Sequence, residues 1–204
     1  MRAIKSLPFL SGAENRESFF RRIKLYYPTL DPRYQAMERA YNTAKDVFRG
    51  TLRDDGERYF EHLRAVTLIL IVYLRVIDHE MIIAALLHDL VEDFPHLWSI
   101  ERVRQEFGQR VAYLVEYLTK PSKDEYPKKE DRDHAYHSRF AAAPREFFLI
   151  KLADRWHNLL TLGGCPKEKQ VRKVAETVQH YLPHAEKHGI LLHEIEAALK
   201  ALAA

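Results

Sequence analysis

The sequence has 204 residues, of which 47% are apolar and 30% are charged, a balance typical of a globular protein of one domain. Its 32 basic and 29 acidic side chains leave a net charge of +3, too small to indicate a nucleic-acid-binding protein. The longest nearly unbroken apolar run, 65–74, is far shorter than a membrane span. A single cysteine, Cys165, excludes an internal disulfide and suits a reducing compartment. We therefore expect a cytoplasmic protein without a nucleic-acid or membrane partner.

The local pattern predicts an all-α fold, because glycine is scarce and no stretch alternates like a strand. An amphipathic segment at 16–26 comes first. A second helix begins at Asp31-Pro32, where Asp caps the helix and Pro takes its first position, and ends at Gly50. After a turn at Asp55-Gly56, a strongly apolar run predicts a buried helix over 59–77.

The next predicted helix is capped by Asp78 and is apolar on every side over 82–87, which indicates burial in a helical core. Four ionisable residues follow within the same predicted helix: His88, Asp89, Glu92 and Asp93. The second pair should lie one turn beyond the first. Burying four such groups without partners is costly, so a metal or a polar pocket is favoured. The alternative is a helix end that becomes polar where it meets solvent, because Pro95 stops it.

Two short helices are predicted next, at 100–107 and 111–118, with a break near Gly108. The segment 120–130 is rich in proline and charge and predicts a loop. Its lysines are either solvated surface or the border of a phosphate pocket: Lys120, Lys123, Lys128 and Lys129.

A helix predicted over 144–162 carries a second informative pattern. Four polar residues fall at i, i+3, i+7 and i+10 and so line up along one face: Lys151, Asp154, Asn158 and Thr161. Their flanks are Leu, Ile, Phe and Trp, so this polar stripe is hard to explain as a solvated face. Arg155 and His157 point elsewhere, and we expect them to form the solvated face.

Candidate ligands come from three predicted buried helices: His62, His88, Asp89 and Asp154. Two imidazoles and two carboxylates suit Mn, Fe, Co, Ni or Zn, and are too rich in nitrogen for Ca or Mg. Alone, a histidine such as His62 would more often be a hydrogen-bonded core residue than a ligand, so this prediction depends on its partners.

The spaced H…HD…D pattern resembles the HD phosphohydrolase superfamily. The match narrows to the hydrolase domain of RelA/SpoT proteins, which the chain resembles over roughly residues 35 to 162. The similar segments are 53–62, 84–93, 107–108, 118–120 and 150–158. The resemblance implies an HD-domain helical bundle with one metal site in the core. We expect one domain over 1–204, with a core at about 35–162, a helical extension at 1–34 and C-terminal helices at 163–204.

The resemblance also implies an activity, the removal of pyrophosphate from the 3′ position of guanosine tetra- or pentaphosphate alarmones, leaving GDP or GTP. The implied ligands of one Mn²⁺ ion are His62, His88, Asp89 and Asp154. Glu92 and Asp93 match the acidic pair that orients or deprotonates the attacking water. Arg53 matches the arginine that packs on the purine base, and the other implied nucleotide contacts are Lys151, Asn158 and Thr161.

The sequence departs from the family pattern at two places. Leu63 stands where the family has proline. Asp54 and Asp55 follow Arg53 where small or basic residues are usual, and these two acidic residues leave guanine and adenine alarmones both open. A 5′-nucleotidase, a nucleoside triphosphate hydrolase and a non-catalytic binding module are the other readings. No synthetase-like region follows, so we expect a stand-alone small alarmone hydrolase, whose terminal segments either modify the pocket or form a homo-oligomer interface.

Overall fold

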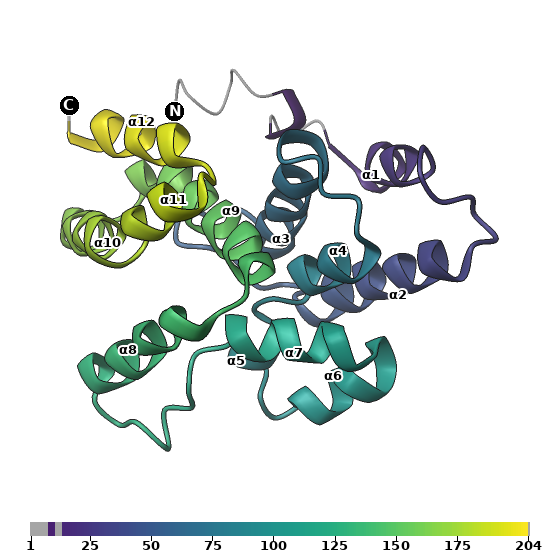
Figure 1. The fold of residues 1–204 in the computed structure, drawn as a ribbon, viewed down its shortest axis with the longest axis horizontal. Helices are drawn as coiled ribbons and strands as arrows, with labels where there is room; N and C mark the ends of the chain where they lie inside the picture. The colour runs from purple at the N-terminus through teal and green to yellow at the C-terminus, as the bar shows by residue number, and fades with distance from the viewer. Residues whose placement is uncertain (1–7, 11–13, 204) are drawn as a thin grey trace.

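The protein is described by a computed structural model that covers residues 8–10 and 14–203. These residues form helices and no strand, which confirms the predicted all-α class (Figure 1). Residues 1–7 and 11–13 of the predicted N-terminal extension lie outside the described part. None of the described helices is long and apolar enough to cross a membrane.

The helices follow one another closely along the chain. The first half contains η2 (Pro8–Leu10), α1 (Arg16–Ile23), α2 (Pro32–Val47), α3 (Tyr59–Leu68), η3 (Ile69–Tyr73), α4 (His79–Leu86), α5 (Leu90–Asp93) and α6 (Ile100–Phe107). The second half contains α7 (Gln109–Leu118), α8 (Lys129–Ser138), η4 (Arg139–Ala142), α9 (Arg145–Thr161), η5 (Leu162–Gly164), α10 (Lys167–His180), α11 (Leu182–His188) and α12 (Leu192–Ala203).

The predicted helix starts are confirmed at α2 and α4. The side chain of Asp31 accepts a hydrogen bond from the N–H of Arg33, and Pro32 opens α2. The side chain of Asp78 accepts from two N–H groups in the first turn of α4. At the far end of α2, Gly50 has a φ of +82°, a left-handed conformation that a side chain would disfavour.

The helix predicted over 59–77 is shorter than expected. α3 passes into the π-helical turn η3, where the N–H of Leu74 bonds the carbonyl of Ile69 at 2.9 Å. The chain then leaves the helix at Arg75, whose φ is +58°. Apolar side chains continue to Ile77, so hydrophobic periodicity did not reveal this end.

Helix α9 is the central element of the fold. It packs against α3, α4 and α7 on one side and against α10, α11 and α12 on the other (Figure 1). Side chains from nearly every direction around α9 are buried, including the charged residues Lys151, Asp154 and Arg155. A buried helix that carries charges must supply partners for them, and these partners form the site described next.

Candidate active site

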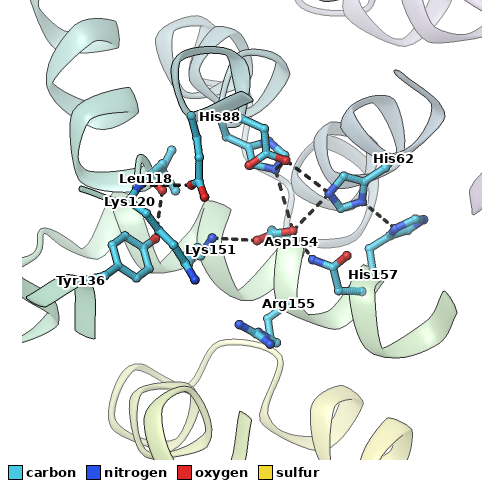
Figure 2. Close-up of polar contacts among 12 residues, drawn as sticks. His62, His88, Leu118, Lys120, Tyr136, Lys151, Asp154, Arg155 and His157 are labelled. Carbon is cyan, nitrogen blue, oxygen red and sulfur yellow. Dashed lines mark hydrogen bonds and ion pairs between the residues drawn. The ribbon is translucent and has the colours of Figure 1, made fainter. Parts of the chain in front are cut away.

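Two histidines and two aspartates meet at α9: His62 comes from α3, His88 and Asp89 from the turn after α4, and Asp154 from α9 itself. His62 of α3, His88 and Asp154 each offer one ligand atom, and these atoms lie within 4.8 Å of one another. Oδ1 of Asp154 is 3.2 Å from Nε2 of His62 and 3.8 Å from Nε2 of His88. Oδ2 of Asp89 is 3.1 Å from Nε2 of His88 and 4.0 Å from Nε2 of His62. The structure thus brings together all four residues predicted as metal ligands, three of which are labelled in Figure 2 (His62, His88 and Asp154); we call the four residues the donor cluster.

The prediction of one helix through residue 93 was wrong. α4 ends at Leu86, and residues 87–89 form a turn before the short α5. Nδ1 of His88 lies 2.8 Å from the carbonyl oxygen of Ala85, the acceptor that the N–H of Asp89 would use in a continuous helix. The imidazole therefore replaces a backbone hydrogen bond where the helix breaks. Both predicted ligands in this segment come from the turn rather than from a helical face.

The donor cluster fits a divalent metal ion. Nε2 of His88 is buried and has no hydrogen-bond partner among the described residues. Because Nδ1 of this ring faces a carbonyl oxygen, which can only accept, Nδ1 carries a proton, and Nε2 is the nitrogen that faces the carboxylates, where it would lose its own proton and present a lone pair to a metal ion. A cation between a buried lone pair and carboxylate oxygens would satisfy both. Two nitrogen and two oxygen donors can therefore hold one divalent ion.

Asp154 is held as an ionised carboxylate. Its Oδ2 lies 3.0 Å from Nζ of Lys151, and its Oδ1 accepts a hydrogen bond of 2.6 Å from Nδ2 of Asn158. Burial raises the pKa of Asp154, but Lys151 and the two histidines of the donor cluster lower it by more than burial raises it. The pKa of Asp154 therefore lies well below its ordinary value. The stripe predicted on α9 is thus a set of mutually paired groups.

The two histidines of the cluster respond to different neighbours. Burial and the charge of Arg53 lower the pKa of His62 to about 4. Burial also lowers the pKa of His88, but the carboxylates of Asp89 and Asp154 raise it to about 9. Negative charge is therefore concentrated around His88, a distribution that a bound cation would balance.

The acidic pair of α5 is divided between two environments. Glu92 borders the cleft described below and accepts hydrogen bonds from the backbone N–H of Lys120 at 3.2 Å and from Arg132 at 3.1 Å. Burial and the charges of Asp89 and Glu92 raise the pKa of Asp93 to about 7. One acid is therefore fixed by cationic and backbone donors at the cleft, and the other is a carboxyl group able to change protonation near neutral pH.

A cleft of about 300 Å³ opens over the donor cluster. The four residues predicted to contact a nucleotide all line it: Arg53, Lys151, Asn158 and Thr161. The guanidinium of Arg53 donates to Oδ1 of Asn158 at 2.8 Å and to Oγ1 of Thr161 at 3.0 Å, so the 53–56 turn is tied to α9. Lys120 lines the cleft as well, in line with one of the two readings of its loop, whereas Lys123, Lys128 and Lys129 are not among the lining residues.

The outer edge of the cleft is formed by the 53–56 turn and the start of α10, and we call it the rim. Asp54 of the turn is paired with Lys169 of α10, and its Oδ2 lies 3.9 Å from Sγ of Cys165. The side chains of this ion pair are 51% and 35% exposed. Of the two acidic residues that depart from the family pattern, Asp54 therefore has a cationic partner at the rim.

Arg155 and His157 were wrongly predicted to form a solvated face of α9; they are only 4% and 5% exposed. The guanidinium of Arg155 lies 3.8 Å from the ring centre of Tyr181 and 3.0 Å from a carboxylate oxygen of Glu176. Nδ1 of His157 lies 2.9 Å from Nδ1 of His62. The i, i+3 spacing of Asp154 and His157 is the only sequence signal that could have placed His157 beside the cluster.

Comparison with known proteins identifies relatives of this chain. A family model described as HD domain matches residues 40–191. The chain is 36% identical over 189 residues to the bifunctional (p)ppGpp synthase/hydrolase SpoT of Escherichia coli K12, covering 91% of this chain and 26% of that protein. It is 39% identical over 150 residues to a guanosine-3′,5′-bis(diphosphate) 3′-pyrophosphohydrolase of Haemophilus influenzae, covering 72% of this chain and 22% of that protein. The chain thus spans about a quarter of the length of these relatives.

A solved structure is similar as well. It is a metazoan ortholog of SpoT described as hydrolyzing ppGpp and playing a role in starvation responses. The two chains align with a TM-score of 0.72 and 25% sequence identity, over 81% of this chain and 94% of the other. The similarity therefore extends over most of both folds.

Proposed function

The chain belongs to the HD domain family, and from this premise we propose that it is a metal-dependent hydrolase that removes pyrophosphate from the 3′ position of guanosine tetra- or pentaphosphate. One observation supports this proposal most strongly. The donor cluster lies beneath a cleft that also holds a polar lining suited to a nucleoside, and relatives of the chain bear the names of enzymes with this activity.

In this proposal His62, His88, Asp89 and Asp154 hold one divalent ion, with manganese as the expected metal. When bound, such an ion lowers the pKa of a coordinated water and offsets phosphate charge. Lys151 compensates the carboxylate of Asp154, since the two groups are 3.0 Å apart, and so keeps it ionised as a ligand.

The acidic pair would handle the proton of the attacking water. Asp93 has a pKa of about 7 and so lies in the range where a general base is effective at neutral pH. Glu92, held by Lys120 and Arg132, would orient the water or the leaving pyrophosphate at the wall of the cleft.

The nucleoside would be fixed by the polar lining between the cluster and the rim. Arg53 would cover the purine base, and Asn158 and Thr161, which already hold its guanidinium, would set its position. A 3′-pyrophosphohydrolase needs this lining because the 3′ substituent must meet the metal, and accurate positioning supplies several kcal/mol of barrier lowering. A simple 5′-phosphatase needs only a grip on the terminal phosphate.

The deciding experiment identifies which bond is broken. Mn²⁺-loaded protein is incubated with guanosine 3′,5′-bis(diphosphate), its adenine analogue, GTP and GMP, and products are separated by chromatography. The expected products are GDP and intact pyrophosphate, with no orthophosphate at early times. Orthophosphate from GTP or GMP, with both 3′-pyrophosphates untouched, would instead assign the chain to the nucleotidases or triphosphate hydrolases.

A further inference from the structure

His157 contacts the donor cluster from behind. In Figure 2 the ring of His62 lies between Asp154 on one side and His157 on the other. Nε2 of His62 faces Asp154 at 3.2 Å, and Nδ1 faces Nδ1 of His157 at 2.9 Å. Both rings are buried, with 1% and 5% of their surfaces exposed. Among the described residues, no other hydrogen bond is formed by Nδ1 of His62.

The contact between two Nδ1 atoms restricts where the protons can be. A hydrogen bond needs one donor and one acceptor, so one of the two Nδ1 atoms carries a proton and the other presents a lone pair. A histidine that binds a metal through Nε2 must keep that nitrogen unprotonated, which leaves its only proton on Nδ1. If His62 is such a ligand, its Nδ1–H donates and Nδ1 of His157 accepts.

We propose that His157 is a positioning residue that accepts the Nδ1–H hydrogen bond of His62 and so holds His62 in the tautomer and orientation that present Nε2 to the metal. This inference rests on the ligand role proposed for His62. It assigns to His157 a function in metal affinity, without contact with the metal or the nucleotide. Metal-binding histidines generally need such a partner on their second nitrogen.

The far side of His157 is compatible with this tautomer. When Nδ1 accepts, the ring proton is on Nε2, which must also have polar surroundings. The ring borders a second, small cavity of about 30 Å³, and polar residues share its wall: Glu57, Glu61 and Arg64. The cavity that the His157 ring borders is therefore not wholly apolar.

The test compares two substitutions of the same shape. Asparagine places an oxygen where Nδ1 of histidine lies, and leucine has the outline of asparagine but cannot accept a hydrogen bond. Mn²⁺ affinity is measured by competition with a chelator for wild type, His157→Asn and His157→Leu. We expect His157→Asn to bind within about threefold of wild type and His157→Leu to bind roughly 10- to 100-fold more weakly. His184→Leu, a histidine packed on Phe148 away from the cleft, is the control and should leave the affinity unchanged.

A second measurement does not depend on the variants folding. Nitrogen-15 NMR of imidazole-labelled wild-type protein loaded with Zn²⁺ reports the proton on each ring. The expected spectrum has His62 protonated at Nδ1 and His157 at Nε2. A proton on Nδ1 of His157 would overturn the inference, as would equal metal affinity of the Asn and Leu variants. Wild-type protein that binds neither ion would overturn the proposed metal centre itself, so the two failures are distinguishable.

Discussion

The donor cluster and the rim of the same cleft are held in contrasting ways. In the cluster, His62 and His88 are 1% exposed and Asp154 is paired on both carboxylate oxygens. At the rim, Asp54 and Lys169 form one ion pair with side chains 51% and 35% exposed. Exposed pairs contribute little to stability, whereas removing one partner of a buried set leaves a charge that water cannot reach. The cluster is therefore fixed before any ligand arrives, and the rim can adjust to the ligand.

The largest effect is expected from the cluster. Asp154→Asn removes the negative charge that His62, His88 and Lys151 face. We therefore expect loss of bound metal and a loss of activity of roughly 10³-fold or more. In wild type, a chelator should lower the melting temperature, because a metal that binds only the native state stabilises it. The variant's melting temperature should not respond to the chelator. Full activity of metal-free wild-type protein would contradict this assignment.

The next largest effect is expected at the buried ion pair that holds Arg155, a residue of the cleft lining between the donor cluster and the rim. Glu176 of α10 is the carboxylate partner of the buried Arg155, and Glu176→Gln should destabilise the fold by about 3 kcal/mol, because it leaves that guanidinium unpaired. Thermal unfolding at pH 7 measures the loss. Glu168→Gln, an exposed carboxylate of the same helix, is the control and should have little effect.

The same variant gives a pH test. Burial raises the pKa of Glu176, but His137, Arg155 and Lys173 lower it by more than burial raises it. The pKa of Glu176 therefore lies well below its ordinary value. A depressed carboxyl pKa stabilises the fold above the unfolded-state pKa of about 4.3 and loses that contribution as pH falls. The stability gap between wild type and Glu176→Gln should therefore narrow below about pH 4.3. A gap that widens on acidification would show that the ion pair is not its cause.

A smaller effect is expected at the acidic pair of α5, of which Glu92 lines the cleft and Asp93 does not. Glu92→Gln and Asp93→Asn should each lower turnover by roughly 10²-fold, since in the proposed mechanism both act beside the ligands rather than among them. Metal content, measured by atomic emission, should stay at the wild-type level. Loss of the metal in either variant would show that the pair belongs to the coordination rather than to proton transfer. Glu101→Gln on the exposed face of α6 serves as the control.

The smallest effect is expected at the rim. Asp54→Asn removes an exposed negative charge and frees Lys169, so KM for guanosine 3′,5′-bis(diphosphate) should fall by about threefold at low salt and by less at high salt. Stability should change by less than about 1 kcal/mol. Asp46→Asn, from a more exposed ion pair with Arg49 at the end of α2, should leave KM unaltered. A rise in KM would mean that Asp54 itself contacts the nucleotide.

Local sequence rules were sufficient for most of the fold. The caps at Asp31 and Asp78 follow from side chains that accept hydrogen bonds from nearby N–H groups, an interaction contained within a few residues. The polar stripe of α9 was equally visible, because helical spacing alone aligns its members. The identity of the candidate ligands followed from residue types, although the helix drawn through His88 and Asp89 is in fact broken.

The misplaced features depend on contacts between distant segments. The break after α4 coincides with the bond between His88 and the carbonyl of Ala85, and no periodic pattern signals it. His157 was assigned to solvent because its partner, His62, lies on another helix. Arg155 was misassigned for the same reason, since the side chain that covers it belongs to α10. A helical wheel shows which residues share a face but not what lies opposite that face.

Helix α9 is synthesised after the segments that carry the other members of the donor cluster, and this order affects how the site is assembled. His62, His88 and Asp89 leave the ribosome before Asp154 and His157, which arrive together on α9. Until that helix docks between α3 and the C-terminal helices, a nascent chain has three donors and no partner for Nδ1 of His62. The same late helix thus supplies the fourth donor and the support for the first. In the proposed metal site, tight capture of an ion would therefore wait until the core around α9 has closed, which would protect the growing chain from trapping an ion in an incomplete site.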